Sequence, residues 1–200
     1  MQWFWLAPNE QRYNNYVLYE ERPLVRIRTR YENLACPQCH KVDDAAALRS
    51  GRDPVVLRAR TDVVGTSDDI YCVSEAFREL FISHGMSGLD FLDIPGQTKY
   101  EVALPTFWAT VDTGKTQFQY EDEGEGWAQF CSTCHRPLRG RYLFPSLASL
   151  SLPQDPLTIA APSIALENPR GKVYWVLVSE VVRNILRENR ISGASYSKAR

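Results

Sequence analysis

Apolar and polar side chains alternate along several segments of the chain, as expected for β-strands with one buried face. The clearest case is Leu24–Tyr31, in which Arg26, Arg28 and Arg30 share one face. β-Branched and aromatic residues predict further strands at Pro54–Ala59, Lys99–Leu104, Phe107–Asp112 and Thr116–Tyr120. A hairpin turn is predicted between the last two of these.

Two other runs have the helical spacing of apolar side chains and similar sequences: 73–81 (VSEAFRELF) and 178–186 (VSEVVRNIL). In each run the serine, Ser74 or Ser179, is the predicted N-cap, and the glutamate after it complements the helix dipole. Gly85 and Asn189 are predicted to adopt the left-handed conformation that ends a helix. Each run therefore predicts a strand, a short amphipathic helix and a tight turn, followed by another extended segment.

The cysteines repeat in the same order as these units. The pair Cys36 and Cys39 precedes the first helix, and the pair Cys131 and Cys134 precedes the second. This order suggests a duplication. We therefore predict a strand-rich α+β single domain over residues 1–200, with two pseudo-repeated halves at about 24–120 and 121–200. Each half contains a CxxC knuckle and a strand–helix–strand unit.

Composition excludes few functions. The chain has 200 residues, 44% hydrophobic and 24% charged, which is ordinary for a globular protein. A formal net charge of -1 gives no general attraction to nucleic acid or to anionic membranes. The first residues have no export signal, and no segment is apolar enough to span a membrane, so we expect a cytoplasmic protein whose cysteines are thiols.

Two CxxC turns that meet in space form a four-thiolate site that suits zinc. Ninety-one residues separate Cys39 from Cys131, so the fold must bring the knuckles together. We predict one structural zinc ion, with these ligands: Cys36, Cys39, Cys131 and Cys134. His40 and His135 could replace a cysteine or lie beside the metal, but we expect knuckle-turn residues hydrogen-bonded to the backbone.

Other functions remain open. Each CxxC is followed by histidine, and C-x-x-C-H is the attachment signature of c-type haem. The chain could therefore be a dihaem electron-transfer protein, which would require an export signal upstream. A zinc-bearing nucleic-acid module is a third possibility. No recognised catalytic motif is present, so we do not expect an enzyme.

An acidic run lies between the predicted halves, at Glu121, Asp122, Glu123 and Glu125. Blocks of like charge are usually solvated loops. The functional interpretation is a negative patch that meets a basic partner by electrostatic complementarity.

The order of these motifs resembles the double-CxxC immunity proteins of bacterial contact-dependent or kin-discrimination toxin systems. The shared elements are an aromatic N-terminal strand at 2–6, a CPxC, a helix ending in a glycine turn, a second CxxC and a strand–helix unit at 176–193. That family usually has glycine after each second cysteine, where this chain has His40 and His135. The resemblance implies a non-enzymatic protein that neutralises a cognate protein toxin, with cysteines that hold the structure together. It implies no nucleic-acid, membrane or small-molecule partner.

Overall fold

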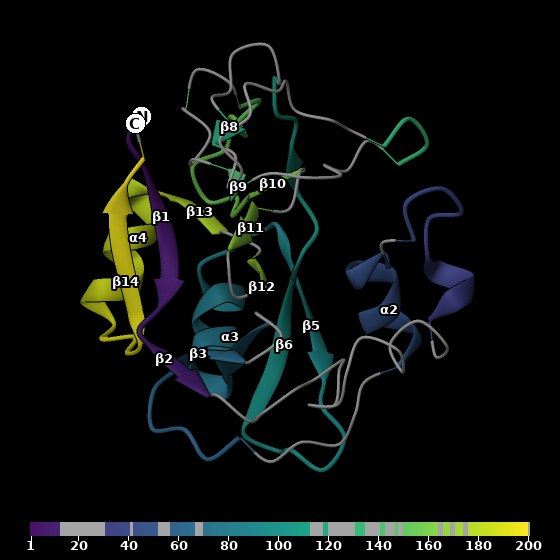
Figure 1. The fold of residues 1–200 in the computed structure, drawn as a ribbon. Coiled ribbons are helices and arrows are strands. Elements are labelled where there is room, and N and C mark those ends of the chain that lie inside the picture. The colour runs from purple at the N-terminus through teal and green to yellow at the C-terminus, as the bar shows by residue number, and fades with distance from the viewer. Residues whose placement is uncertain are drawn as a thin grey trace.

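The computed structural model is a strand-rich α+β fold in which short helices pack on antiparallel sheets (Figure 1). It describes residues 1–12, 31–40, 42–51, 57–66, 70–112, 118–119, 131–134, 141–142, 147, 150–163, 166–168, 171–173 and 176–199. The predicted fold class is confirmed. Among the described residues, no helix is long and apolar enough to cross a membrane.

The elements are short. The helices are η1 (Glu32–Leu34), α2 (Asp44–Ser50), α3 (Glu75–Ser83) and α4 (Glu180–Glu188). The strands up to residue 109 are β1 (Trp3–Pro8), β2 (Glu10–Arg12), β3 (Val63–Thr66), β4 (Tyr71–Ser74), β5 (Leu89–Asp93), β6 (Tyr100–Pro105) and β7 (Trp108–Ala109). The later strands are β8 (Phe118–Gln119), β9 (Arg141–Tyr142), β10 (Ala161–Pro162), β11 (Leu166–Asn168), β12 (Gly171–Val173), β13 (Val176–Ser179) and β14 (Ala194–Lys198).

Two strand–helix–strand segments are arranged in the same way. In the first, which we call the α3 unit, β4 leads into α3 and then β5, and both strands pair antiparallel with β6. In the second, the α4 unit, β13 leads into α4 and then β14, and both strands pair antiparallel with β1. The central strand of the α4 unit therefore comes from the N-terminus of the chain, and the two termini lie side by side (Figure 1).

The two units also share their strand registers. Ser74 lies opposite Tyr100, as Ser179 lies opposite Trp3. At the other end of the central strand, Pro105 lies opposite Leu89. Correspondingly, Pro8 lies opposite Ala194. Corresponding positions of the two units can therefore be compared residue by residue.

The turn that follows each helix packs on an extended segment that precedes the other helix. The backbone amide of Ile159 donates to the carbonyl of Ser87 at 2.8 Å, and that of Val63 donates to the carbonyl of Ser192 at 3.1 Å. The next residue in each turn is a glycine with positive φ, 92° at Gly88 and 81° at Gly193. The two units thus interlock through a pair of matching turns.

The core extends across both units. Phe77 and Phe81 of α3 share one cluster of buried side chains with Val182 and Leu186 of α4. Strand β1 is buried on both faces: Phe4 and Leu6 belong to this cluster, whereas Trp3 and Trp5 belong to another with Leu177. This explains why the N-terminal segment is apolar throughout rather than alternating.

The helix predictions are confirmed with two corrections. Ser74 and Ser179 cap their helices by accepting hydrogen bonds from the amides of Phe77 and Val182. Val73 and Val178, however, which the helical spacing includes, lie in the preceding strands, and these strands run to Ser74 and Ser179.

The second correction concerns the helix ends. Gly85 is left-handed as predicted, with φ 64°, but Asn189 is not, because its φ is -87°. Helix α4 continues to Glu188, so Asn189 is its C-cap and Arg190 takes the left-handed position, with φ 58°.

Some strand predictions differ from the structure. Strand β6 lies as predicted, but the predicted strand at 107–112 shrinks to the two residues of β7. The described strands on either side of the predicted hairpin do not pair with each other, because β7 pairs with β10 and β8 pairs with β9, while the turn itself, at 113–117, lies outside the described residues. Each of these two strands thus pairs with a strand that is more distant in sequence.

Residues 57–59 are irregular, and residues 24–30, 54–56 and 116–117 lie outside the described part of the chain. The division into related halves at 24–120 and 121–200 stays a prediction.

Candidate metal centre

The first CxxC pair lies in a short loop whose ends are joined by backbone pairing. Ala35 and Val42 form an antiparallel bridge across the loop. Inside it, the amide of His40 donates to the carbonyl of Cys36 at 2.8 Å. This turn directs the side chains of Cys36 and Cys39 to the same side, as a metal-binding knuckle requires.

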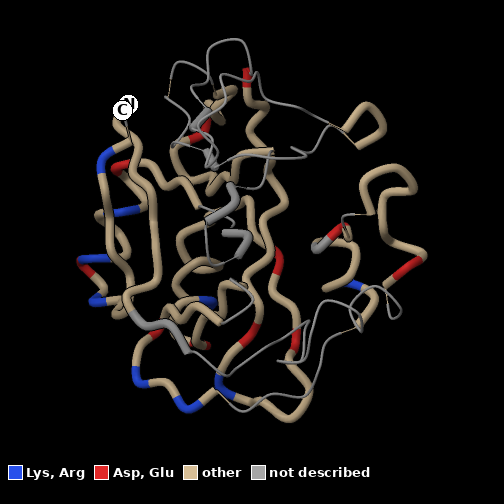
Figure 2. The backbone as a smooth tube through the Cα atoms, in the orientation of Figure 1, with Lys and Arg blue, Asp and Glu red and all other residues tan. Residues whose placement is uncertain are grey.

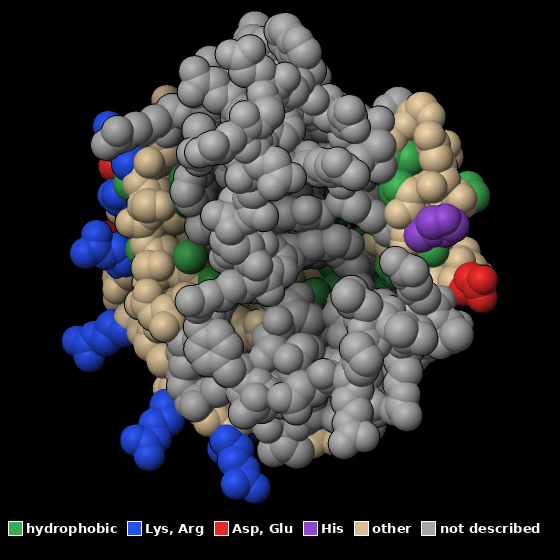
Figure 3. All heavy atoms as spheres, in the orientation of Figure 1, with side chains coloured by type: hydrophobic (Ala, Val, Ile, Leu, Met, Phe, Trp, Pro, Cys, Tyr) green, Lys and Arg blue, Asp and Glu red, His purple; other side chains and the backbone are tan. Residues whose placement is uncertain are grey.

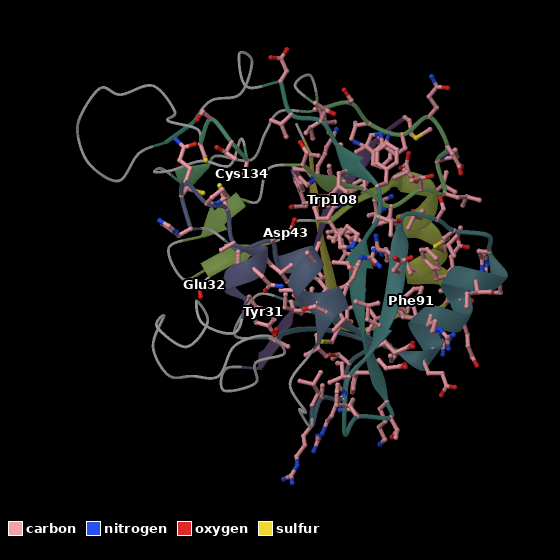
Figure 4. The ribbon with its side chains drawn as sticks, turned by 90° about the vertical axis from the view of Figure 1, so that its right-hand side faces the viewer. Tyr31, Glu32, Asp43, Phe91, Trp108 and Cys134 are labelled. Carbon is pink, nitrogen blue, oxygen red and sulfur yellow. The ribbon has the colours of Figure 1, made fainter. Side chains whose placement is uncertain are left out.

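Helix α2 anchors this knuckle to the rest of the molecule. Asp43 caps the helix by accepting from the amide of Ala46 at 3.0 Å. Ala47 and Leu48 are almost fully buried in a core cluster that also contains residues of β4 and β6. The first knuckle is therefore held against the sheet of the α3 unit, on the face that points away from α3. In Figure 4, Cys134 of the second knuckle lies on the same side of the molecule as Asp43, away from Phe91.

The fold brings the second CxxC pair directly against the first. The sulfur atoms of Cys36 and Cys131 are 3.6 Å apart, and those of Cys39 and Cys134 are 3.5 Å apart. All four sulfurs lie within 4.8 Å of one another. Cys36 and Cys131 are buried and the other two are half-buried, and none of the four is in a disulfide. The four predicted ligands thus form one cluster compatible with a metal site.

The cluster has the dimensions of a tetrahedral thiolate site. Zinc–sulfur bonds of about 2.3 Å in a tetrahedron place neighbouring sulfurs about 3.8 Å apart. The Cys36–Cys131 and Cys39–Cys134 sulfur pairs are within a few tenths of an ångström of that value. The residues present therefore fit a single ion with four sulfur ligands.

The knuckles also favour the ionised thiolate, which is the form that binds metals. The backbone amide of Cys39 hydrogen-bonds the sulfur of Cys36 and lowers the pKa of that thiol from 9.0 to about 6, although burial opposes the shift. In the second knuckle, the backbone amide of Cys134 lowers the pKa of Cys131 in the same way. Each knuckle thus uses its own backbone to stabilise negative charge on its first cysteine.

Gln38 joins the two knuckles and was not predicted from the sequence. Its side-chain oxygen accepts hydrogen bonds from the hydroxyls of Ser132 at 2.7 Å and Thr133 at 2.8 Å. The thiol of Cys131 also lies 3.4 Å from this oxygen. The only signal in the sequence is that the middle positions of the two CxxC turns include polar residues, Gln38 in the first and Ser132 and Thr133 in the second. Their partners could not be assigned without the fold.

The two histidines differ in what the structure describes. His40 is exposed, and no atom of it belongs to the group of possible ligands among the described residues. Its φ is 57°, the left-handed conformation that favours glycine. His135 lies outside the described residues, as does the acidic run at 121–125.

The shared cluster bears on the haem alternative. Two covalent haems would need a separate macrocycle beside each CxxC pair, with an iron ligand from the following histidine. The sulfurs of the two pairs instead face one another at 3.5–3.6 Å. This arrangement favours one shared ion over two haems.

Comparison with known proteins adds no further assignment. No protein-family description, curated protein or solved structure matches the chain.

Proposed function

We propose that the four-cysteine cluster holds one structural zinc ion. The observation that carries this proposal is the approach of four sulfurs, from segments 95 residues apart, to within 4.8 Å of one another. When bound, zinc would neutralise the thiolates and cross-link the two knuckles. Four cysteine ligands leave no position for water or substrate, which is typical of structural zinc sites.

Native mass spectrometry of the intact protein tests the metal. We expect one zinc ion per chain under native conditions and none after denaturation. Cys39→Ser and Cys134→Ser should each lose the ion, because each removes one of the four thiolates. Cys72→Ala is the matched control, since Cys72 is a buried cysteine in β4 outside the cluster. Folded wild-type protein without metal would contradict the proposal, and haem masses that survive denaturation would favour electron transfer.

We propose that the zinc-stabilised fold binds and neutralises a cognate bacterial toxin. The support is the motif order of the chain, which resembles the double-CxxC immunity proteins, together with a four-cysteine site that is closed to catalysis. Such a protein would act by stoichiometric binding across an interface of about 1,600 Å². The acidic run would be part of the surface that meets a basic toxin.

Coexpression with the toxin encoded next to this protein tests neutralisation. The wild-type protein should restore growth and form a 1:1 complex with the toxin. Replacing Glu121, Asp122, Glu123 and Glu125 by their amides should slow association and weaken protection. Glu75→Gln with Glu79→Gln is the control, because both residues are exposed acids on α3. The proposal fails if the wild-type protein neither binds nor protects, and the role of the acidic run fails if both variants behave alike.

A further inference from the structure

A pocket lies between α4 and β14, on the side of the molecule opposite to α2 and the first knuckle (Figure 1). It has a volume of about 470 Å³ and is lined by Phe4, Arg183, Arg187, Arg190, Ile191 and Tyr196 among others. This volume is in the range of pockets that take small ligands or a few groups of a larger one. No part of it belongs to the cysteine cluster.

The pocket is positively charged. Arg183 stacks on the ring of Phe4, with its guanidinium carbon 3.9 Å from the ring centroid, and is paired with Glu180 at 3.3 Å. Arg187 and Arg190 form no ion pair with any described residue. Lys and Arg positions recur along the edge of the molecule where α4 and β14 lie (Figure 2), and basic side chains project from that edge (Figure 3). Within the described part of the chain, two of the three lining arginines are therefore without an acidic partner.

The same pocket contains an unused hydrogen-bonding group. The hydroxyl of Tyr196 is buried and has no partner among the described residues. Burial raises the pKa of Tyr196 to about 12, although Arg187 and Arg183 oppose the shift, so the phenol stays a neutral donor at physiological pH. Buried polar groups are nearly always paired, and an isolated one suggests a missing partner.

The α3 unit lacks the unpaired arginines and the buried hydroxyl at the corresponding positions. Arg78 corresponds to Arg183, but it pairs with Glu101 at 3.4 Å, and Glu101 occupies the register position of Phe4. The residue that corresponds to Arg187 is Ile82. In the α3 unit, one arginine is therefore neutralised, and a second is replaced by an apolar side chain.

Two further positions differ in the same sense. Phe91 corresponds to Tyr196 and packs edge-on against Phe81, with ring centroids 5.1 Å apart, so no hydroxyl is buried there. Gly85 corresponds to Arg190, and both are left-handed. A non-glycine residue in this conformation costs about 1 kcal/mol. The α4 unit thus carries an arginine where the backbone favours glycine, as strained functional positions often do.

We propose that the pocket between α4 and β14 binds an oxyanion, presented as a phosphate or a carboxylate group. Arg187 and Arg190, which pair with no acidic side chain among the described residues, supply positive charge. The hydroxyl of Tyr196 is buried as the structure stands, so it becomes a neutral donor to the ligand once the ring turns toward the pocket. Arg183 forms one wall, held in place by Phe4 and Glu180. The proposal does not depend on the identity of a toxin or on zinc.

Titration of the full-length protein with inorganic phosphate, and separately with acetate, tests this site by calorimetry and by thermal shift. Sodium chloride at the same ionic strength is the reference. We expect saturable binding to the wild-type protein. Arg187→Gln should weaken it at least about tenfold, because it removes a charge-assisted hydrogen bond. Arg78→Gln is the control, because Arg78 is the α3 residue that corresponds to the pocket residue Arg183. This variant should bind the anion as the wild type does.

Arg190→Gly and Tyr196→Phe are further variants that should fold, since the α3 unit has glycine and phenylalanine at these positions. Both should weaken binding. Saturation by phosphate alone or by acetate alone would support the site and identify the group it takes. The proposal is overturned if neither anion binds beyond the chloride reference, or if Arg187→Gln and Arg190→Gly bind as tightly as Arg78→Gln.

Discussion

The α3 and α4 units share strand order, helix caps and turns, yet their outer surfaces differ in charge. The face of α3 carries Arg78 paired with Glu101, whereas the corresponding face of α4 carries Arg183 over an aromatic ring. The shared parts are the ones that backbone geometry demands: a serine cap, a left-handed residue and a glycine against a neighbouring strand. The comparison shows that the fold constrains the residues of the caps and turns. The exposed face of each helix is less constrained, so its charged and polar residues can differ between the units.

The largest expected effect is at the two interlocking turns. A Cβ at Gly88 would overlap the carbonyl oxygen of Ile159, and a Cβ at Gly193 would overlap that of Val63, both at positive φ. Gly88→Ala and Gly193→Ala should each lower the free energy of unfolding by more than about 3 kcal/mol. Gly85→Ala is the control in urea denaturation, because open space surrounds Gly85 and only the strain of about 1 kcal/mol remains. A similar loss for all three variants would contradict the interlock.

The helix caps should come next. Ser74→Ala and Ser179→Ala each remove the acceptor for an amide in the first turn and should cost about 1–2 kcal/mol in urea denaturation. Each serine also donates outward, Ser74 to the carboxylate of Asp62 and Ser179 to the carbonyl of Pro156. Nearly equal losses are expected because both caps have the same two roles. A loss confined to one unit would show that only one cap contributes to stability.

Acid should weaken the two turns unequally. Asp62 accepts hydrogen bonds from the amide and hydroxyl of Ser192, whereas the matching Ser87 contacts the hydroxyl of Thr158, which does not titrate. Burial raises the pKa of Asp62, but the hydrogen bonds from Ser192 and Ser74 outweigh it and hold the pKa below 3.8. Because the folded-state pKa is depressed, this stabilisation is present above about pH 4 and is lost as the pH falls through the folded-state pKa.

Urea denaturation at pH 6 and pH 3 measures this effect. The wild-type protein should lose more stability between the two pH values than Asp62→Asn does. Thr158→Val, in the other turn, should keep the pH dependence of the wild type. If Asp62→Asn kept the pH dependence of the wild type, the loss of stability in acid would not come from Asp62.

The smallest expected effects are gains in stability. Arg190→Gly and His40→Gly each place glycine at a left-handed position, with φ 58° and 57°. Relief of backbone strain should raise the free energy of unfolding by about 0.5–1 kcal/mol in each variant. Asn189→Gly is the control for the first, because Asn189 has an ordinary negative φ and glycine should not stabilise it. A loss of stability in Arg190→Gly would mean that its side chain makes compensating contacts.

Local signals in the sequence predicted the parts of this fold that depend on neighbouring residues. The serine caps, Gly85 and the four cysteines were found in this way, because capping and knuckle chemistry need only a few consecutive positions. Strand partners were not predictable in this way. Pairing of β1 with β13 and β14 depends on non-local burial of Trp3–Leu6, and the two-residue strands carry too little pattern to select a partner.

Two functional features needed the three-dimensional structure. Gln38 is one polar residue among many until the fold places Ser132 and Thr133 beside it. The arginines of α4 resemble an ordinary solvated helix face, and only the pocket, the unpaired hydroxyl of Tyr196 and the comparison with α3 distinguish them.

X-ray absorption at the zinc edge of the purified protein tests the central claim most directly. The account predicts one zinc ion with four sulfur neighbours at about 2.3 Å. The same measurement on Cys72→Ala should give an identical shell, because that cysteine lies outside the cluster. A shell containing nitrogen or oxygen ligands, or folded protein without zinc, would contradict the four-cysteine site.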